Sequence, residues 1–264
     1  MKKRILWITV IVILILAIGL SLAAKPIYQL YIRHMIDSGH YSDAEATVRS
    51  FALDHDISFS EYPEEILALL ERNPETEEFV LHYPLEYGKE PNIDLSAYEN
   101  SDTVPLFLQW DRQWGYIEYG SNVAGLTACG PVCLAMAGYY LTGDARFSPD
   151  KVMQFAMDNG YYAPGSGSSW SLISEGGWKL GLDITEIPLD ENRIIRNLEV
   201  DNPIICVMGP GDFTTTGHFI VMTGYENGMI RINDPNSVEN SEKLWAYEDI
   251  YDQIKNLWVI RAIG

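Results

Sequence analysis

The chain is short of positive charge. It has 18 lysine and arginine residues against 37 aspartate and glutamate residues, which gives a net charge of −19 at pH 7. This balance argues against nucleic acid and against an anionic membrane surface as partners. The sequence also lacks internal repeats and low-complexity segments. Because 47% of the residues are hydrophobic and 21% are charged, the composition is that of a globular protein.

Cysteine and histidine are also scarce. The three cysteines, Cys129, Cys133 and Cys206, cannot all pair with one another, so at least one thiol is expected to remain free. Cys129 and Cys133 have the spacing C-x-x-x-C, which differs from the redox motif C-x-x-C. Of the five histidines, only His218 follows Val104. Both residue types are few enough to be considered one by one.

The N-terminus carries a long uncharged run. Lys2, Lys3 and Arg4 precede the mostly apolar residues 5–22, a length close to the roughly 20 residues that span a bilayer. We predict that residues 1–24 form a membrane anchor whose basic end lies in the cytoplasm, so that the rest of the chain is extracellular. The small-residue sequence Ser21-Leu22-Ala23 leaves cleavage of a signal segment, and secretion, as the alternative.

Residues 25–102 are predicted to form a helical membrane-proximal segment followed by a linker. Ser42 or Asp43 could cap a helix that continues through the apolar positions after it. Proline followed by acids marks two later helix starts. The expected elements are a helical stretch over 25–53, a helix from Tyr62-Pro63, a helix from Asn73-Pro74 to about Tyr83-Pro84, and a linker over 85–102.

Residues 103–264 are predicted to form the main domain. Helical patterns come first and β-rich runs cluster towards the end, which favours an α+β fold over a doubly wound sheet. Ser148 is the expected cap of the second helix. The expected elements are a strand-like entry over 104–110, helices over 129–141, 149–159 and 171–180, a Gly/Ser loop over 161–170, and strands over 204–208, 218–222 and 229–232.

Cys129 stands where a small-residue loop turns into an apolar helix. Pro131 is tolerated in the first turn of a helix, where its missing N–H would have had no partner. The run from Leu134 to Leu141 then has helical apolar spacing. Cys129 is therefore expected at or just before a helix N-terminus, where unpaired N–H groups and the helix dipole favour a thiolate. Because a thiolate is a nucleophile, Cys129 is a candidate catalytic residue.

His218 and Asp234 could supply a base and its orienting carboxylate. If Cys129 takes its base from its own domain, that base is His218. A hairpin turn at Asn227-Gly228 returns the chain towards Asp234. Simple counting about this turn places Asp234 opposite Val221, at the same end of the hairpin as His218 and within its reach if the register slips or bulges slightly. A carboxylate there could hold the imidazole in the tautomer that accepts a proton from the thiol.

A donor for a developing oxyanion is also needed. Gln109 and Gln113 are the only glutamines shortly before Cys129. The backbone N–H of Cys129, at the start of its helix, would be the second donor.

Taken in order, four short motifs resemble the C39-like cysteine peptidases, whose fold is similar to that of papain. They are the segment 104–115 around Gln109, Ala128-Cys129-Gly130-Pro131, Gly217-His218 with the apolar residues after it, and Asn233-Asp234-Pro235. The resemblance covers roughly residues 103–260. It implies an α+β, papain-like peptidase domain with N-terminal helices packed on an antiparallel sheet, preceded by the membrane helix and the small helical segment. It further implies Cys129 as nucleophile, His218 as base, Asp234 as orienter and Gln109 as oxyanion donor, with no cofactor.

The sequence thus predicts an extracytoplasmic cysteine peptidase that cleaves a peptide or protein substrate through a Cys129 acyl-enzyme. The loops 161–170 and 209–216 are candidate walls of the substrate cleft, with Trp170 as a binding face. Three alternatives stay open. They are an amidase or transpeptidase acting on cell-wall peptides, a tethered module that holds a peptide without cutting it, and a zinc site of Cys129, Cys133, Cys206 and His218.

Overall fold

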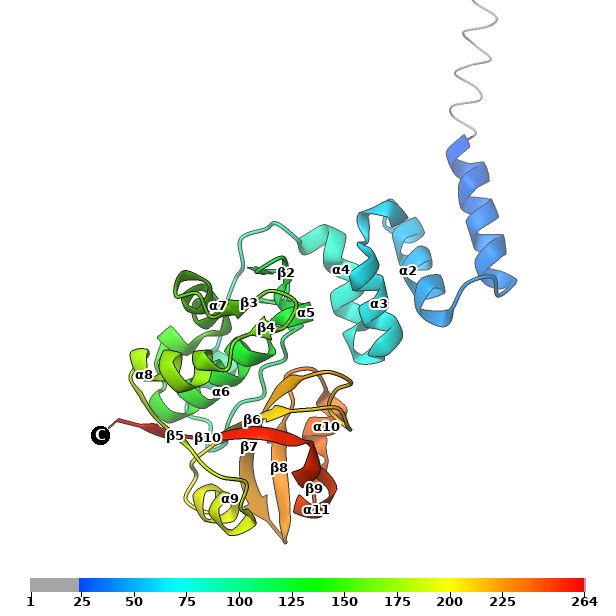
Figure 1. Cartoon of the computed structure of the whole chain (residues 1–264). Coiled ribbons are helices and arrows are strands. Elements are labelled where there is room, and N and C mark those ends of the chain that lie inside the picture. Colours follow the sequence, from blue (N-terminus) through cyan, green and yellow to red (C-terminus); the bar gives the residue numbers. More distant parts are fainter. Residues whose placement is uncertain (1–23, 264) are drawn as a thin grey trace, which may run out of the picture. The chain divides into compact units, whose positions relative to one another are not determined.

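The computed structural model describes residues 24–263, which Figure 1 draws as a coloured ribbon. Contacts within the chain divide it into two compact units, the first ending at Pro74 and the second beginning at Glu75. The predicted membrane anchor, residues 1–24, falls almost wholly outside the described residues. Between residues 24 and 263, no helix is long and apolar enough to cross a bilayer.

The first unit is helical in its described part. Its elements are a helix over 24–37, α2 (Asp43–Asp54), η1 (Phe59–Glu61) and α3 (Glu64–Arg72). The helical stretch expected over 25–53 is present as two helices, because the chain turns at Gly39, whose φ is 69°. A new helix, α2, begins after Ser42, whose hydroxyl oxygen accepts a hydrogen bond from the Glu45 backbone N–H. Ser42 is therefore the cap, one of the two residues expected for that role.

The second unit is a mixed α/β domain built on one antiparallel six-stranded sheet. The strand order is β5-β10-β6-β7-β8-β9. These strands are β5 (Leu182–Glu186), β6 (Ile204–Met208), β7 (His218–Glu226), β8 (Met229–Asn233), β9 (Leu244–Trp245) and β10 (Ile254–Ala262). Short hairpins pair β1 (Glu118–Tyr119) with β2 (Asn122–Val123) and β3 (Tyr162–Ala163) with β4 (Gly167–Ser168). This bears out the predicted α+β class with an antiparallel sheet.

The second unit also contains helices. They are α4 (Glu77–Glu86), α5 (Ala124–Thr127), α6 (Cys129–Thr142), α7 (Pro149–Asp158), α8 (Gly177–Lys179), α9 (Glu191–Leu198), α10 (Val238–Glu242) and α11 (Tyr247–Ile250). Single turns are η2 (Pro74–Thr76, at the junction of the units), η3 (Ser96–Tyr98), η4 (Ala145–Phe147), η5 (Leu172–Gly176) and η6 (Tyr251–Gln253). The helices expected over 129–141 and 149–159 are thus present as α6 and α7. Ser148 occupies the N-cap position of α7, but its side chain makes no capping hydrogen bond.

The segment 104–110 is not a strand, contrary to expectation. Pro105 has no backbone N–H with which to join a ladder. The side-chain amide of Asn233 instead donates to the carbonyl oxygens of Val104, at 3.0 Å, and Pro105, at 3.1 Å. The start of this segment is therefore fixed to the sheet by the Asn233 side chain rather than by strand pairing.

Other boundaries also differ from the prediction. Helix α4 passes through Pro84, and the Tyr87 N–H closes its last turn on the Tyr83 carbonyl at 2.9 Å. The loop expected over 161–170 contains the hairpin β3–β4. The helix expected over 171–180 is the π-helical turn η5 followed by α8. The strands β5 and β10 were not predicted.

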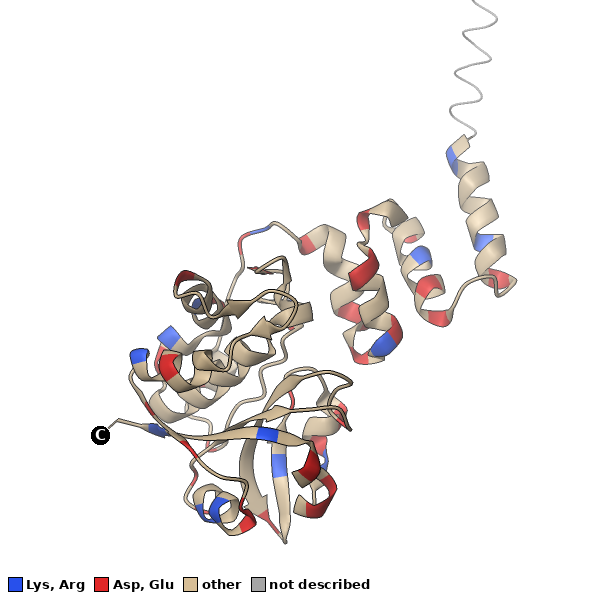
Figure 2. Ribbon diagram, in the orientation of Figure 1, with Lys and Arg blue, Asp and Glu red and all other residues tan. Residues whose placement is uncertain are grey.

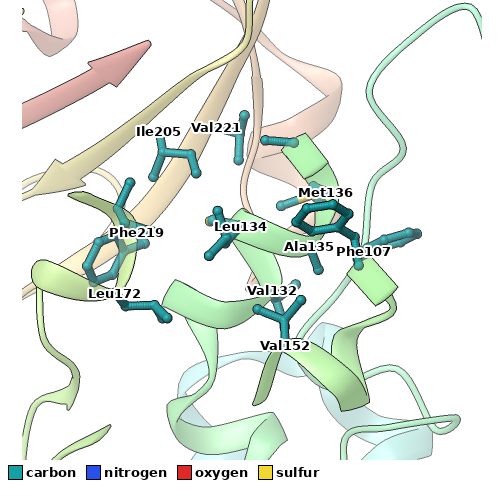
Figure 3. Packing of buried hydrophobic residues seen from close by; sticks show 14 of the residues in the cluster. Phe107, Val132, Leu134, Ala135, Met136, Val152, Leu172, Ile205, Phe219 and Val221 are labelled. Atoms are coloured by element: carbon teal, nitrogen blue, oxygen red, sulfur yellow. The ribbon is translucent and has the colours of Figure 1, made fainter. Parts of the chain in front are cut away.

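The sheet carries an apolar cluster on each face. On one face, Ile205, Phe219 and Val221 belong to the same buried cluster as Leu134 of α6, and Figure 3 shows these side chains together. The alternate residues of β6 and β7 join Ile194 of α9 in the second cluster. Each fully buried aliphatic side chain contributes roughly 1.5–3 kcal/mol. Helix α6 has no charged residue (Figure 2), as expected of a helix surrounded by core.

Candidate active site

Cys129 is the first residue of α6, and its side chain is partly exposed. The His218 ring and the backbone N–H groups of Phe219 and Gly130 lie around the Cys129 sulfur and lower the pKa of its thiol. Gly130 belongs to the first turn of α6, whose N–H groups have no partner within the helix. Phe219 belongs to β7. The start of a helix and the start of a strand therefore meet at this one sulfur atom.

The groups around Cys129 lower the pKa of its thiol. Burial alone would raise the pKa of the thiol, but the hydrogen bond to His218, the charge of that ring and the two backbone N–H groups lower it overall. The other two cysteines differ, since burial raises the pKa of Cys133 well above its usual range and also raises that of Cys206. All three thiols are unpaired. Of the three, only Cys129 has surroundings that favour the thiolate.

His218 is the first residue of β7 and is 8% exposed. Its Nε2 lies 2.7 Å from Oδ1 of Asp234, which leaves Nδ1 as the ring nitrogen for the Cys129 sulfur. Burial is the largest single influence and would lower the pKa of His218, but the Asp234 carboxylate and Cys129 together outweigh it and raise the pKa to about 10. The opposite shifts of Cys129 and His218 favour a thiolate–imidazolium pair at neutral pH.

A β-bulge brings Asp234 to His218. The chain reverses at Asn227-Gly228, as predicted, with positive φ at both residues. The predicted register is wrong by one residue, because the bulge between Met222 and Gly224 places Asn233, not Asp234, opposite Val221. Asp234 then comes level with Ile220, on the same side of the strand as His218. Without the bulge, the carboxylate would face the other side of the sheet.

Asp234 is held by several neighbours and is 1% exposed. Besides His218, its Oδ1 accepts a hydrogen bond from the Asn236 backbone N–H at 2.8 Å. Its Oδ2 accepts one from Nδ2 of Asn240 at 2.9 Å. Both oxygens of this buried carboxylate therefore have hydrogen-bond donors. Asp234 is therefore fixed in the orientation that holds the His218 ring.

Gln109 is buried, and hydrogen bonds attach it to both sides of the site. Its Nε2 donates to the carbonyl oxygen of Gly125 in α5 at 2.9 Å. Its backbone N–H donates to the carbonyl oxygen of Pro235, next to Asp234, at 2.7 Å. Gln113 instead accepts a hydrogen bond from the Asp94 backbone N–H at 2.7 Å. Of the two glutamines, the structure attaches Gln109 to the segments that carry Cys129 and Asp234.

The sequence of this domain matches a known family. Residues 101–261 match the family described as Peptidase_C39 like family. The chain belongs to this family. A comparison with curated proteins found no match.

Two crystal structures resemble this C39-like domain. The peptidase domain of Streptococcus ComA, a bifunctional ABC transporter involved in quorum sensing, is 20% identical, with a TM-score of 0.39 over 52% of this chain and 92% of that one. A putative C39-like peptidase from Bacillus anthracis is 13% identical, with a TM-score of 0.39 over 61% of this chain and 96% of that one.

The β3–β4 hairpin of the C39-like domain lies against the first turn of α6. A Cβ atom added to Gly130 would stand 2.8 Å from Cβ of Ser168, whose hydroxyl is 2.7 Å from that of Tyr119. Trp170, just beyond the hairpin, is 46% exposed and packs edge-on against Trp258. The part of the loop 161–170 that forms this hairpin is therefore next to Cys129, as a substrate wall would have to be.

The loop 209–216, the second candidate wall, leads directly into His218. Gln253 anchors it, since the Gln253 carbonyl accepts from the Gly209 N–H at 2.7 Å and its Oε1 accepts from the Asp212 N–H at 2.8 Å. The loop is thus held at the end of the sheet where His218 begins β7.

Several residues around the site could not be anticipated. Asn240 contacts Asp234 only because the turn after β8 folds back. The backbone N–H of Phe219 lies near Cys129 only because β7 begins beside α6. In the described part of the chain, no group of three or more histidine, cysteine and carboxylate side chains is arranged to hold a metal ion. The zinc alternative has no support there, since Cys133 and Cys206 are fully buried core residues. A cavity of about 660 Å³ lies at the other end of α6, beside Tyr139 and Gly143.

Proposed function

We propose that this C39-like protein is a cysteine peptidase that hydrolyses peptide bonds with Cys129 as its nucleophile, in a papain-like domain. The observation that carries the proposal is the contact chain from Cys129 to His218 to Asp234. It joins a helix start, a strand start and a strand end that are far apart in the sequence. Each member has the partner that its role requires.

The reaction follows from the charge states of the pair. The Cys129 thiolate attacks the carbonyl carbon of the scissile peptide bond, and the carbonyl oxygen becomes an oxyanion. As the tetrahedral intermediate collapses, the C–N bond breaks and the His218 imidazolium gives its proton to the leaving amine. A thioester on Cys129 remains. Neutral His218 then takes a proton from water, whose oxygen attacks the thioester. The C–S bond breaks, which releases the carboxylic acid and restores the Cys129 thiolate beside the His218 imidazolium.

Gln109 and the first turn of α6 would stabilise the oxyanion. The Gly125 carbonyl occupies one N–H of the Gln109 amide, and this contact fixes which way the amide points. The second N–H remains for the oxyanion. The Cys129 backbone N–H, at the first position of α6, is the other donor.

The substrate would be a peptide or protein outside the cell. This part of the proposal depends on the basic and apolar N-terminus, which predicts an anchor or a secretory segment. The membrane would then be a partner through the N-terminal helix, and the catalytic domain would be extracellular.

Alkylation of the thiols tests the nucleophile. The folded full-length protein is treated with a limiting amount of iodoacetamide, and the label is located by mass spectrometry. We expect label on Cys129, with Cys133 and Cys206 as internal controls, and loss of labelling in His218→Ala. Equal labelling of all three cysteines would contradict the proposal.

The substrate class needs a separate experiment. Incubation with peptide libraries and with cell-wall digests, followed by mass spectrometry, should show cleaved peptides that are absent with Cys129→Ala. Products from the cell-wall digests alone would assign the same acyl-enzyme chemistry to an amidase or transpeptidase.

A further inference from the structure

The turn that carries Asp234 is held by a residue from the beginning of the second unit. Helix α10 follows Asp234 closely, and its first backbone N–H groups belong to Val238 and Glu239. The carboxylate of Glu75 accepts both, with Oε2 at 2.9 Å from the Val238 nitrogen and Oε1 at 2.8 Å from the Glu239 nitrogen. These are charge-assisted hydrogen bonds between segments far apart in the sequence.

Glu75 completes the cap of α10. The Ser237 hydroxyl oxygen accepts from the third N–H of the helix, that of Asn240, at 3.1 Å. Glu75 takes the first two, so the first three N–H groups of α10 are satisfied. A helix as short as α10 is not stable by itself in water. Its position therefore depends on these capping contacts.

Helix α10 in turn holds Asp234 through its side chain and its backbone. Nδ2 of Asn240 donates to Asp234 Oδ2 at 2.9 Å. The Ser241 hydroxyl accepts from the Asp234 backbone N–H, also at 2.9 Å, and donates to the Ser237 carbonyl at 2.7 Å. Displacing the start of α10 would move both contacts. Asp234 would then hold the His218 ring less firmly.

We infer that Glu75 is a positioning residue for the catalytic site, which acts through α10 and Asn240 on Asp234. The inference rests on the proposed function, since it assigns Glu75 a part in setting the Cys129–His218 pair. It also gives a role to the segment just before α4. That segment supplies a contact on which the geometry of Asp234 depends, so it is more than a spacer between the peptidase domain and the N-terminus.

Thiol reactivity tests this role without a known substrate. The second-order rate of Cys129 alkylation by iodoacetamide is measured at pH 6, where Asp234 must keep His218 protonated for Cys129 to be a thiolate. The charged groups that act on His218 are Asp234 and Cys129. For Glu75→Ala we expect the rate to fall about tenfold, the effect of losing a charge-assisted hydrogen bond. The pH midpoint of the reaction should move upwards.

Matched variants separate positioning from general structure. Glu75→Gln keeps one oxygen acceptor and should lose only about two- to threefold. Glu77→Gln makes the same charge change on an exposed residue in the first turn of α4 and should react like the wild type. Asn240→Ala should match Glu75→Ala, and the double variant should be no slower than the slower single variant, because both act on one pathway.

The outcomes distinguish the two proposals. If wild-type Cys129 reacts no faster than Cys133 and Cys206, the nucleophile assignment and this inference are both overturned. If Cys129 reacts selectively but Glu75→Ala keeps the wild-type rate and pH midpoint, this inference alone is overturned, even where thermal unfolding shows a lower Tm. Additive effects of Glu75→Ala and Asn240→Ala would also overturn it, because independent effects would exclude the route through Asn240.

Discussion

Cys129 and Cys133 lie one turn apart on the same helix, yet their surroundings are opposite. Cys129 is partly exposed and its pKa is lowered, whereas Cys133 is fully buried and its pKa is raised well above the usual range. The two residues share a type, a helix and a neighbouring sheet. What differs is that the first turn of α6 offers unpaired N–H groups and meets the start of β7, where His218 and Phe219 lie.

The first turn of α6 and its later turns have different roles. In the second turn and beyond, α6 fills the core, and a thiol there acts as a small apolar side chain. In the first turn, the same helix presents its dipole and its N–H groups to the end of the sheet. The pKa of a thiol on α6 therefore depends on whether the thiol lies in the first turn of the helix, where β7 begins beside it.

Removing each thiol gives the largest expected contrast. Cys129→Ala should lower peptidase activity by at least about 10³-fold, because no other side chain can form the acyl-enzyme. Cys133→Ala should retain activity and lose about 1 kcal/mol of unfolding free energy through a small cavity. Product formation by mass spectrometry and urea unfolding measure the two effects. Activity retained in Cys129→Ala, or lost in a folded Cys133→Ala, would contradict the assignment of Cys129 as the nucleophile and Cys133 as a core residue.

Removing the charge of Asp234 should change the pH dependence of the activity. Asp234 is a leading cause of the raised pKa of His218, about 10, so Asp234→Asn should bring that pKa down towards its ordinary 6.5. Because the imidazolium protonates the leaving amine, activity should begin to fall at a lower pH than in the wild type. At neutral pH we expect a loss of activity that is smaller than the loss on removal of the nucleophile.

A pH–rate profile of kcat checks this prediction. An alkaline limb that stays in place in Asp234→Asn would show that Asp234 does not set the protonation of His218. The control is a separate alkylation experiment on the same variant, in which the rate for Cys133 should not respond to the change.

Gln109→Ala tests the oxyanion donor. Losing one such donor should lower kcat by about 10²- to 10³-fold with little change in KM, since the contact forms with the developing charge. Gln113→Ala is the matched control, because Gln113 contacts the linker at Asp94 instead. Steady-state kinetics on a cleaved library peptide give both parameters. Equal losses in the two variants would remove Gln109 from the mechanism.

Local patterns were enough to predict the first turn of α6 and the choice of His218. Pro131 and the apolar run after it place the helix start, and no other histidine follows Val104. The turn at Asn227-Gly228 also predicts the hairpin. Its register differs by one residue from a count about the turn, because a bulge lies between Met222 and Gly224 and a turn signal carries no information on it.

Contacts between distant segments had no local signal. Glu75 caps α10 only because the fold brings the two together, and its sequence neighbours are ordinary helix-start residues. The entry segment at Val104 was read as a strand because its apolar residues fit one. Its backbone is instead bound by the Asn233 side chain, which no periodicity reveals.

Substitutions of two glycines in α6 test whether its first turn differs from its later turns, and their expected effects are the smallest. In Gly138→Ala, the new methyl group would overlap the buried Phe147 ring. Overpacking costs about 1–3 kcal/mol, which the better helix propensity of alanine offsets only in part. The rate of Cys129 alkylation should not change, because Gly138 lies in the core-filling part of α6.

In Gly130→Ala, the new methyl group would stand 2.8 Å from Cβ of Ser168, a milder overlap than the 2.2 Å from the Phe147 ring in Gly138→Ala. The stability loss should therefore be smaller than in Gly138→Ala, at about 1 kcal/mol. Gly130 also gives its backbone N–H to the Cys129 sulfur, so a shift of this turn weakens a contact that favours the thiolate. Cys129 alkylation at pH 6 should slow by about two- to fivefold, the loss expected from weakening one hydrogen bond. If instead Gly138→Ala slows alkylation and Gly130→Ala does not, the first turn is not the part of α6 that sets the reactivity of its thiol.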